Sequence, residues 1–95
     1  MKIDLKQKVA LVSGGSRGIG AAIVKVLAEA GSDIAFTYVA DKSSATQVEA
    51  TVKKLGGRCL VLKTLVSSQK QVHIAVQKTV REFGRIYILV YNAGI

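Results

Sequence analysis

The sequence SGGSRGIG, from Ser13 to Gly20, carries four glycines in eight residues between an apolar run and a helical pattern. The apolar run, residues 8–13, is typical of a buried parallel strand. Glycines at such a junction allow backbone angles that a Cβ forbids, and they let the backbone approach a ligand closely. The N-terminus of the next helix offers free N–H groups and a favourable dipole to a pyrophosphate. The stretch therefore predicts a phosphate-binding turn, although not a Walker A loop, which ends in Gly-Lys-Ser/Thr.

The same unit of apolar run, turn, amphipathic helix and glycine recurs along the chain. Residues 34–38, 59–62 and 86–90 are predicted as further strands, and Ser-x-x-Gln at 44–47 and 68–71 predicts two capping boxes. The glycines at 31, 56 and 84 are expected to end the helices. The predicted core stripes of the helices are Ile19, Ala22, Ile23, Val26, Leu27 and Ala30, then Ala45, Val48, Val52 and Leu55, then Val72, Ala75, Val76, Thr79, Val80 and Phe83.

Short strands that alternate with helices predict an α/β fold with a parallel sheet and right-handed crossovers. We predict a Rossmann-like half, βαβαβαβ, with four strands in the order 3-2-1-4 and three crossover helices. Residues 1–95 are interpreted as one domain. In this order the first two helices cover one face, and the third alone covers the other, which leaves the first strand thinly covered there. The fourth strand is an open edge.

Composition narrows the class of protein. The hydrophobic share of 49 % excludes intrinsic disorder, and no apolar run approaches the ~20 residues of a membrane span. The N-terminus does not resemble a signal peptide, and the lone Cys59 and His73 predict neither an internal disulfide nor a metal site, so we expect a cytoplasmic protein. The net charge is +8, but the basic residues are scattered, so no nucleic-acid partner is predicted.

The spacing Gly14-x-x-x-Gly18-x-Gly20 resembles the fingerprint of the short-chain dehydrogenase/reductase family, Thr/Ser-Gly-x-x-x-Gly-x-Gly. Tyr-Asn-Ala-Gly at 91–94 is similar to the family's Asn-Asn-Ala-Gly, and Phe-Gly-Arg-Ile at 83–86 also resembles the family. The resemblance covers essentially all 95 residues. Within the family, residues 14–20 look most like the 3-oxoacyl-[acyl-carrier-protein] reductases of fatty-acid biosynthesis. The resemblance implies that residues 1–95 are a single truncated Rossmann-type dinucleotide-binding domain, the N-terminal, cofactor-binding half of an NADP-dependent oxidoreductase.

The end of the second predicted strand bears on the choice of cofactor. An NAD-binding fold usually has a carboxylate there for the ribose 2′-OH, but residues 37–39 are Thr-Tyr-Val, and Asp41 follows only in the loop. Arg17 in the glycine turn and Lys42 after the strand are cations that suit the 2′-phosphate of NADP. We predict NADP(H), with NAD(H) the less favoured alternative. An ordinary exposed cation is the alternative interpretation of both residues.

The turn and the resemblance together define a predicted cofactor-binding set without a metal ligand or a catalytic residue. It consists of Gly14, Ser16, Arg17, Gly18, Ile19, Gly20, Tyr38, Leu65, Val66, Asn92, Ala93 and Gly94. Three positions depart from the family pattern: Leu65 and Tyr87 stand where an Asp is usual, and Tyr91 where an Asn is usual. Leu65 cannot accept a hydrogen bond from the adenine amino group, and Tyr91 would place a bulky ring near the cofactor.

Two functions of different classes follow. In the first, the chain is part of a reductase that transfers hydride to a 3-oxoacyl or related carbonyl. The resemblance implies a catalytic Ser and a helical Tyr-x-x-x-Lys pair that these residues lack, so the chain alone is predicted to be inactive. Tyr38-x-x-x-Lys42 crosses a strand end and a loop, and is rejected. In the second, the chain is a truncated or engineered half-fold that forms a homo-oligomer through the edge of its fourth strand, without cofactor or catalysis.

Overall fold

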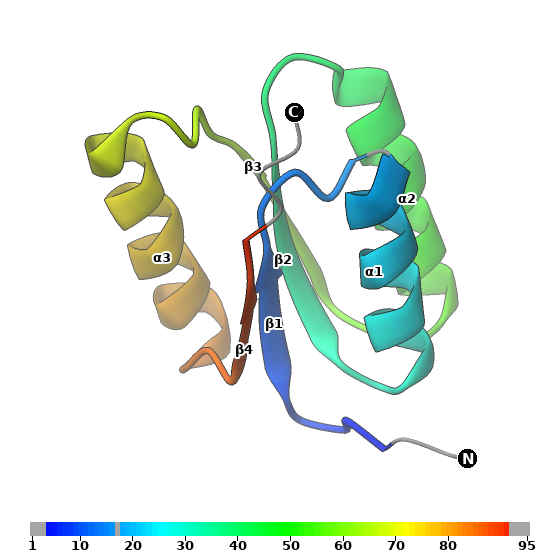
Figure 1. The fold of residues 1–95 in the computed structure, drawn as a ribbon. Helices are drawn as coiled ribbons and strands as arrows, with labels where there is room; N and C mark the ends of the chain where they lie inside the picture. Colours follow the sequence, from blue (N-terminus) through cyan, green and yellow to red (C-terminus); the bar gives the residue numbers. More distant parts are fainter. Residues whose placement is uncertain (1–3, 17, 92–95) are drawn as a thin grey trace.

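The computed structural model describes residues 4–16 and 18–91 (Figure 1). In this part of the chain, strands and helices alternate as the sequence predicts. They are β1 (Val9–Val12), α1 (Gly18–Glu29), β2 (Asp33–Tyr38), α2 (Lys42–Lys54), β3 (Cys59–Lys63), α3 (Gln69–Phe83) and β4 (Ile88–Val90). The fourth strand begins two residues later than predicted, although the Tyr87 N–H still donates to the Val9 carbonyl (2.8 Å).

The strands form one parallel sheet in the order β3-β2-β1-β4, which confirms the predicted topology. Ala10 of β1 lies opposite Ile34 of β2 and Ile88 of β4, and Ile34 lies opposite Cys59 of β3. Figure 1 shows α1 and α2 on one face of the sheet and α3 on the other. All strands are parallel, so the segments that follow them meet at one edge, called the carboxyl edge below.

The main core lies between the sheet and the pair α1–α2. Alternate strand residues point into it, because successive side chains of a strand face opposite sides. Its buried members are Ala10, Val12, Val24, Ala28, Ile34, Phe36, Ala45 and Val52. Phe36 is its largest fully buried side chain, at the centre of β2.

Helix α1 faces the core with a different side from the one predicted. Gly20, Val24 and Ala28 are buried, with Ile23 and Leu27 packed beside them, whereas Ile19 is 73 % exposed and Val26 is also exposed. The prediction was wrong because α1 is apolar almost all round. The small residues Gly20 and Ala28, which allow the helix to approach the sheet, were not counted as core.

Helix α3 leaves a different strand uncovered from the one predicted. All four residues of β1 are buried, because α3 packs over β1, β2 and β3. The uncovered strand is β4, where Leu89, paired with the buried Leu11 on this face, is 65 % exposed. The apolar surface therefore continues from β1 to the open edge of the sheet.

The helix caps agree with the sequence at one of two predicted sites. The Ser68 hydroxyl accepts the Gln71 N–H at the start of α3, which is half of the predicted capping box. The reciprocal half is not formed, because the Ser68 N–H donates to the Leu65 carbonyl and the Gln71 Oε1 accepts the Leu65 N–H. Helix α2 instead begins at Lys42 with Asp41 as its N-cap, whose carboxylate accepts the N–H (3.0 Å) and hydroxyl (2.7 Å) of Ser44. An ionised carboxylate is the stronger acceptor for a helix N-terminus, so Asp41 takes the role predicted for Ser44.

A charged pair joins the start of β2 to the segment before β3. The Asp33 carboxylate accepts the Arg58 backbone N–H (3.0 Å), Nε (3.1 Å) and Nη2 (2.8 Å). Partial burial opposes ionisation of Asp33, but the hydrogen bonds and charge of Arg58 outweigh it and hold the pKa of this carboxyl below its usual value.

Beside this pair, burial raises the pKa of the Cys59 thiol to about 12, as expected of an inert core thiol.

Two findings limit the chemistry of the described residues. No helix among them is long and apolar enough to cross a membrane. Nor do residues 4–16 and 18–91 bring together three His, Cys, Asp or Glu side chains that could hold a metal ion.

Candidate cofactor-binding site

The glycine turn lies at the carboxyl edge and is held there by the neighbouring strands. The Gly14 N–H donates to the Thr37 hydroxyl (2.9 Å), and the Gly15 N–H donates to the Thr37 carbonyl (3.0 Å). The Ser13 N–H donates to the Val90 carbonyl (2.9 Å). The turn is thus bonded to the ends of β2 and β4, the strands on either side of β1.

The glycines of the turn are required for two different reasons. Gly14 and Gly18 take φ angles of 68° and 61°, in the left-handed region that favours glycine. Gly15 is required for space, because a Cβ there would lie 2.6 Å from the Phe36 Cβ and 3.0 Å from the Val24 Cγ2. The turn therefore lies directly on the core between β2 and α1.

The N-terminus of α1 begins at the turn and is open to solvent. Gly18 is its first residue, and a Cβ added there would meet nothing within 4 Å. No acidic residue occupies the first turn of α1, and Ile19 beside it is largely exposed. The first N–H groups of a helix have no partner within the helix. An anion that approached Gly18 would meet these donors and the positive end of the helix dipole.

The structure brings five predicted site residues together in this turn: Gly14, Ser16, Gly18, Ile19 and Gly20. Arg17, Asn92, Ala93 and Gly94 lie outside the described residues.

The other predicted contacts lie beyond β2 and β3. Tyr38 ends β2 and is half-buried against the main core, so part of its ring serves packing. Leu65 follows β3 and is 46 % exposed, and its N–H donates to the Gln71 Oε1 (2.7 Å). Val66 is half-buried in the same turn. Tyr91, expected to crowd the cofactor, lies just beyond β4 and is largely exposed.

Sequence reasoning missed Thr37, which holds the turn through both its hydroxyl and its carbonyl. The available signal was a hydroxyl residue at a buried position of an apolar strand, since a buried hydroxyl needs a partner. Tyr38 and Lys42 lie on a strand and a helix respectively, so they share no helix face and cannot form a catalytic pair.

The chain matches the family model for short chain dehydrogenases over residues 8–95. A solved short-chain dehydrogenase/reductase from Serratia marcescens is 47 % identical, with a TM-score of 0.92 over 96 % of this chain and 37 % of its own. A short chain dehydrogenase from Burkholderia cenocepacia, solved in complex with NADP, is 45 % identical with a TM-score of 0.93 over the same shares. L-rhamnose 1-dehydrogenase (NADP(+)) from Thermoplasma acidophilum is 39 % identical over 98 % of this chain and 37 % of its own length.

The chain therefore belongs to the short-chain dehydrogenase family. It spans 37 % of the length of each of these three relatives, and the matched part contains the glycine turn.

The contact between Gly15 and Phe36 gives a stability prediction. Gly15→Ala forces a methyl group into closely packed atoms, so we expect the free energy of unfolding to fall by about 1–3 kcal/mol. Ser16→Ala, one residue further along the turn, is the matched control and should change the free energy of unfolding by less than about 0.5 kcal/mol. Urea denaturation followed by circular dichroism measures both. A Gly15→Ala variant with the wild-type midpoint would contradict the packing described.

Proposed function

We propose that the chain binds NADP(H) through the glycine turn and the N-terminus of α1, as the cofactor-binding part of an oxidoreductase. The observation that carries the proposal is the open helix start at Gly18, where an added Cβ would meet nothing within 4 Å among the described residues. Gly14, Ser16, Gly18, Ile19 and Gly20 would hold the pyrophosphate, and Arg17 belongs to the same proposed set. In open α/β sheets ligands bind at the point where the strand order reverses, here between β1 and β4.

The carboxyl edge also supports the preference for NADP over NAD. No carboxylate ends β2, and Asp41 beyond it already accepts two hydrogen bonds from Ser44. A ribose 2′-OH would compete with that cap, whereas a 2′-phosphate needs cations, which Arg17 and Lys42 supply in this proposal. Tyr38, Leu65 and Val66 would enclose the adenosine, and Asn92, Ala93 and Gly94 belong to the same proposed cofactor-binding set. The NADP complex of the Burkholderia cenocepacia relative supports the same choice.

The proposed reaction is hydride transfer to a 3-oxoacyl or related carbonyl, as the likeness of residues 14–20 to 3-oxoacyl reductases implies. A bound nicotinamide supplies the hydride. The described residues bind and orient the dinucleotide, but Tyr38 and Lys42 do not form a general acid. We propose that these 95 residues bind the cofactor without turnover. A cytoplasmic location is part of the proposal, since the lone Cys59 fits a reducing compartment.

Fluorescence titration of the chain with NADPH, beside NADH at equal salt, tests the proposal. We expect saturable binding with NADPH the tighter ligand. Gly18→Ala adds a methyl group where the pyrophosphate would approach, so we expect its Kd for NADPH to rise about tenfold or more.

Gly56→Ala is the matched control. Gly56 also has a positive φ (94°) and open space around its missing Cβ, but it follows α2, away from the carboxyl edge. It carries the same kind of backbone strain and should leave the Kd unchanged. Binding that is absent in the folded chain, or equal in both variants, would overturn the proposed site.

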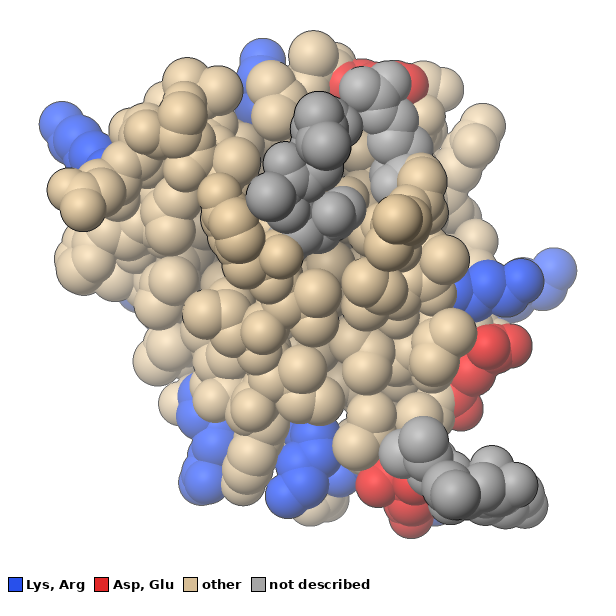
Figure 2. Space-filling view, viewed as in Figure 1, with Lys and Arg blue, Asp and Glu red and all other residues tan. Residues whose placement is uncertain are grey.

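A second proposal concerns self-association through β4. Among residues 4–16 and 18–91 this strand pairs only with β1, which leaves its other edge open there. Leu89 within the strand and Tyr87 and Tyr91 on either side of it are all exposed. Figure 2 shows that charged side chains lie mainly around the margins of this face. We propose that two chains pair through this edge, which hides apolar surface and unpaired backbone groups.

Light scattering coupled to size-exclusion chromatography tests the pairing. We expect the wild-type chain to be a dimer or larger, and Leu89→Glu to shift it to a monomer, because a carboxylate would be buried at the interface. Val39→Glu places the same charge at an exposed apolar position after β2 and should leave the assembly unchanged. A monomeric wild-type chain at high concentration would contradict the proposal.

A further inference from the structure

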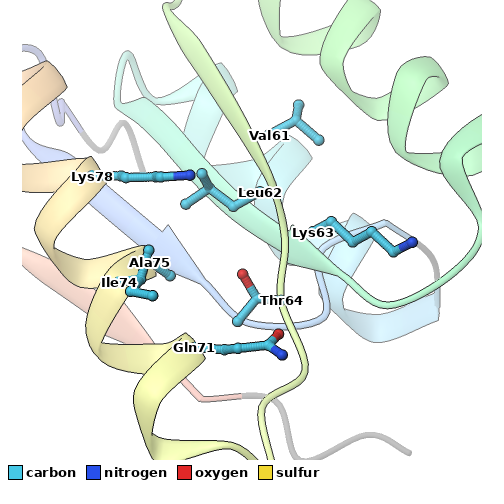
Figure 3. Close-up of a pocket in the computed structure, with 8 residues that line it drawn as sticks. All are labelled: Val61, Leu62, Lys63, Thr64, Gln71, Ile74, Ala75 and Lys78. Carbon is cyan, nitrogen blue, oxygen red and sulfur yellow. The ribbon is translucent and has the colours of Figure 1, made fainter.

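A hollow lies between α3 and the edge strand β3, on the opposite face of the sheet from α1 (Figure 3). Its volume is about 320 Å³, at the lower end of the range for small-molecule sites. Leu62 and Thr64, two residues apart, line it from the same face of β3 and its extension. Gln71, Ala75 and Lys78 line it from one stripe of α3, because their spacing of four and three residues places them on one helix face.

Thr64 places an unused hydroxyl in this hollow. The side chain is only 4 % exposed, and Figure 3 shows its oxygen pointing into the space between β3 and α3. The hydroxyl makes no hydrogen bond to any residue in 4–16 or 18–91, and its oxygen is not sealed from the hollow. Because this oxygen is accessible from the hollow, its partner would be a ligand or a water molecule that enters there.

Two donors from α3 accompany this hydroxyl. The Gln71 Oε1 is occupied by the Leu65 N–H, which leaves the side-chain NH₂ as the free end of the amide. Lys78 extends its ammonium group from α3 toward Leu62 at the upper end of the hollow in Figure 3. Within the described residues Lys78 has no ion pair, and no carboxylate lines the hollow. Lys63 also lines the hollow, but Figure 3 shows its side chain extending away from α3. The side-chain groups that face α3 can therefore all donate hydrogen bonds, and Lys78 is the cation among them.

We propose that this hollow binds a small organic monocarboxylate, separately from the dinucleotide site. One ammonium group balances one negative charge, and the Thr64 hydroxyl and Gln71 amide supply hydrogen bonds to the carboxylate oxygens. Leu62, Ile74 and Ala75 present an apolar wall for a short hydrocarbon chain. Because Gln71 also holds the Leu65 N–H, the Leu65 amide is a natural reporter of occupancy.

The test is a titration of the ¹⁵N-labelled chain with sodium hexanoate, followed by two-dimensional NMR. Hexanamide, which has the same length and no charge, is the matched probe. We expect saturable shifts of the Thr64, Leu65, Gln71 and Lys78 amides with hexanoate, and much weaker binding of hexanamide. Shifts confined to the glycine turn, equal binding of the two probes, or no saturable shift around the hollow would each overturn the proposal.

Three variants test which side chains of the hollow bind the carboxylate. Lys78→Met keeps the length of the side chain but removes its charge, and we expect it to raise the Kd for hexanoate about tenfold or more. Thr64→Val removes only the hydroxyl and should also weaken binding. Lys70→Met removes a charge from the same helix outside the hollow, and should leave the Kd within about twofold of wild type. Equal affinity of Lys78→Met and wild type would overturn the proposed role of the ammonium group.

Discussion

The contact between Gly15 and Phe36 is the constraint on which the carboxyl edge of this protein depends. Phe36 fills the centre of the core. Only a residue without a Cβ can cross above it, because a Cβ at Gly15 would lie 2.6 Å from the Phe36 Cβ. The adjacent Gly14 and Gly15 N–H groups are then within reach of Thr37, which fixes the path of the turn. That path delivers the chain to the exposed Gly18, where α1 starts with N–H groups that have no partner within the helix. Core packing and the proposed phosphate site are therefore one structural feature.

The two faces of the sheet are used differently. Helices α1 and α2 close a continuous core on one face, whereas α3 on the other covers β1, β2 and β3 but leaves β4 bare. The exposed Leu89 is a direct consequence of this arrangement, and the strand order separately makes β4 an edge strand among the described residues. The hollow beneath Thr64 lies on the α3 face as well, beside the opposite edge strand, β3. Assembly and a second ligand site are thus both proposed for the face that one helix covers incompletely.

The strand order, the helix positions and the place of the glycine turn could be predicted from the sequence. For these features the hydrophobic periodicity, the turn residues and the family resemblance all agree. The buried face of α1 could not be predicted, because its apolar residues surround the helix and the contact is made by Gly20 and Ala28. Asp41 displaced Ser44 as the cap of α2 because its carboxylate is the stronger acceptor, and the Ser-x-x-Gln pattern does not weigh neighbouring acceptors against each other. The role of Thr37 depends on a contact between segments 23 residues apart, and the Thr64 hollow depends on how α3 packs against β3, and periodicity reports neither. The predicted roles of Arg17 and of residues 92–94 concern positions outside the described residues.

Amide hydrogen exchange at Gly14 and Gly15 in the ligand-free chain tests the central claim most directly. If Thr37 holds the turn in place before any cofactor arrives, both amides should exchange at least about a hundredfold more slowly than in an unstructured peptide. Amides in the middle of β1 and β2 provide the reference for the folded sheet. Exchange of Gly14 and Gly15 at unstructured rates, in a chain whose β1 and β2 amides are protected, would contradict the account: the sheet would then form without fixing the turn.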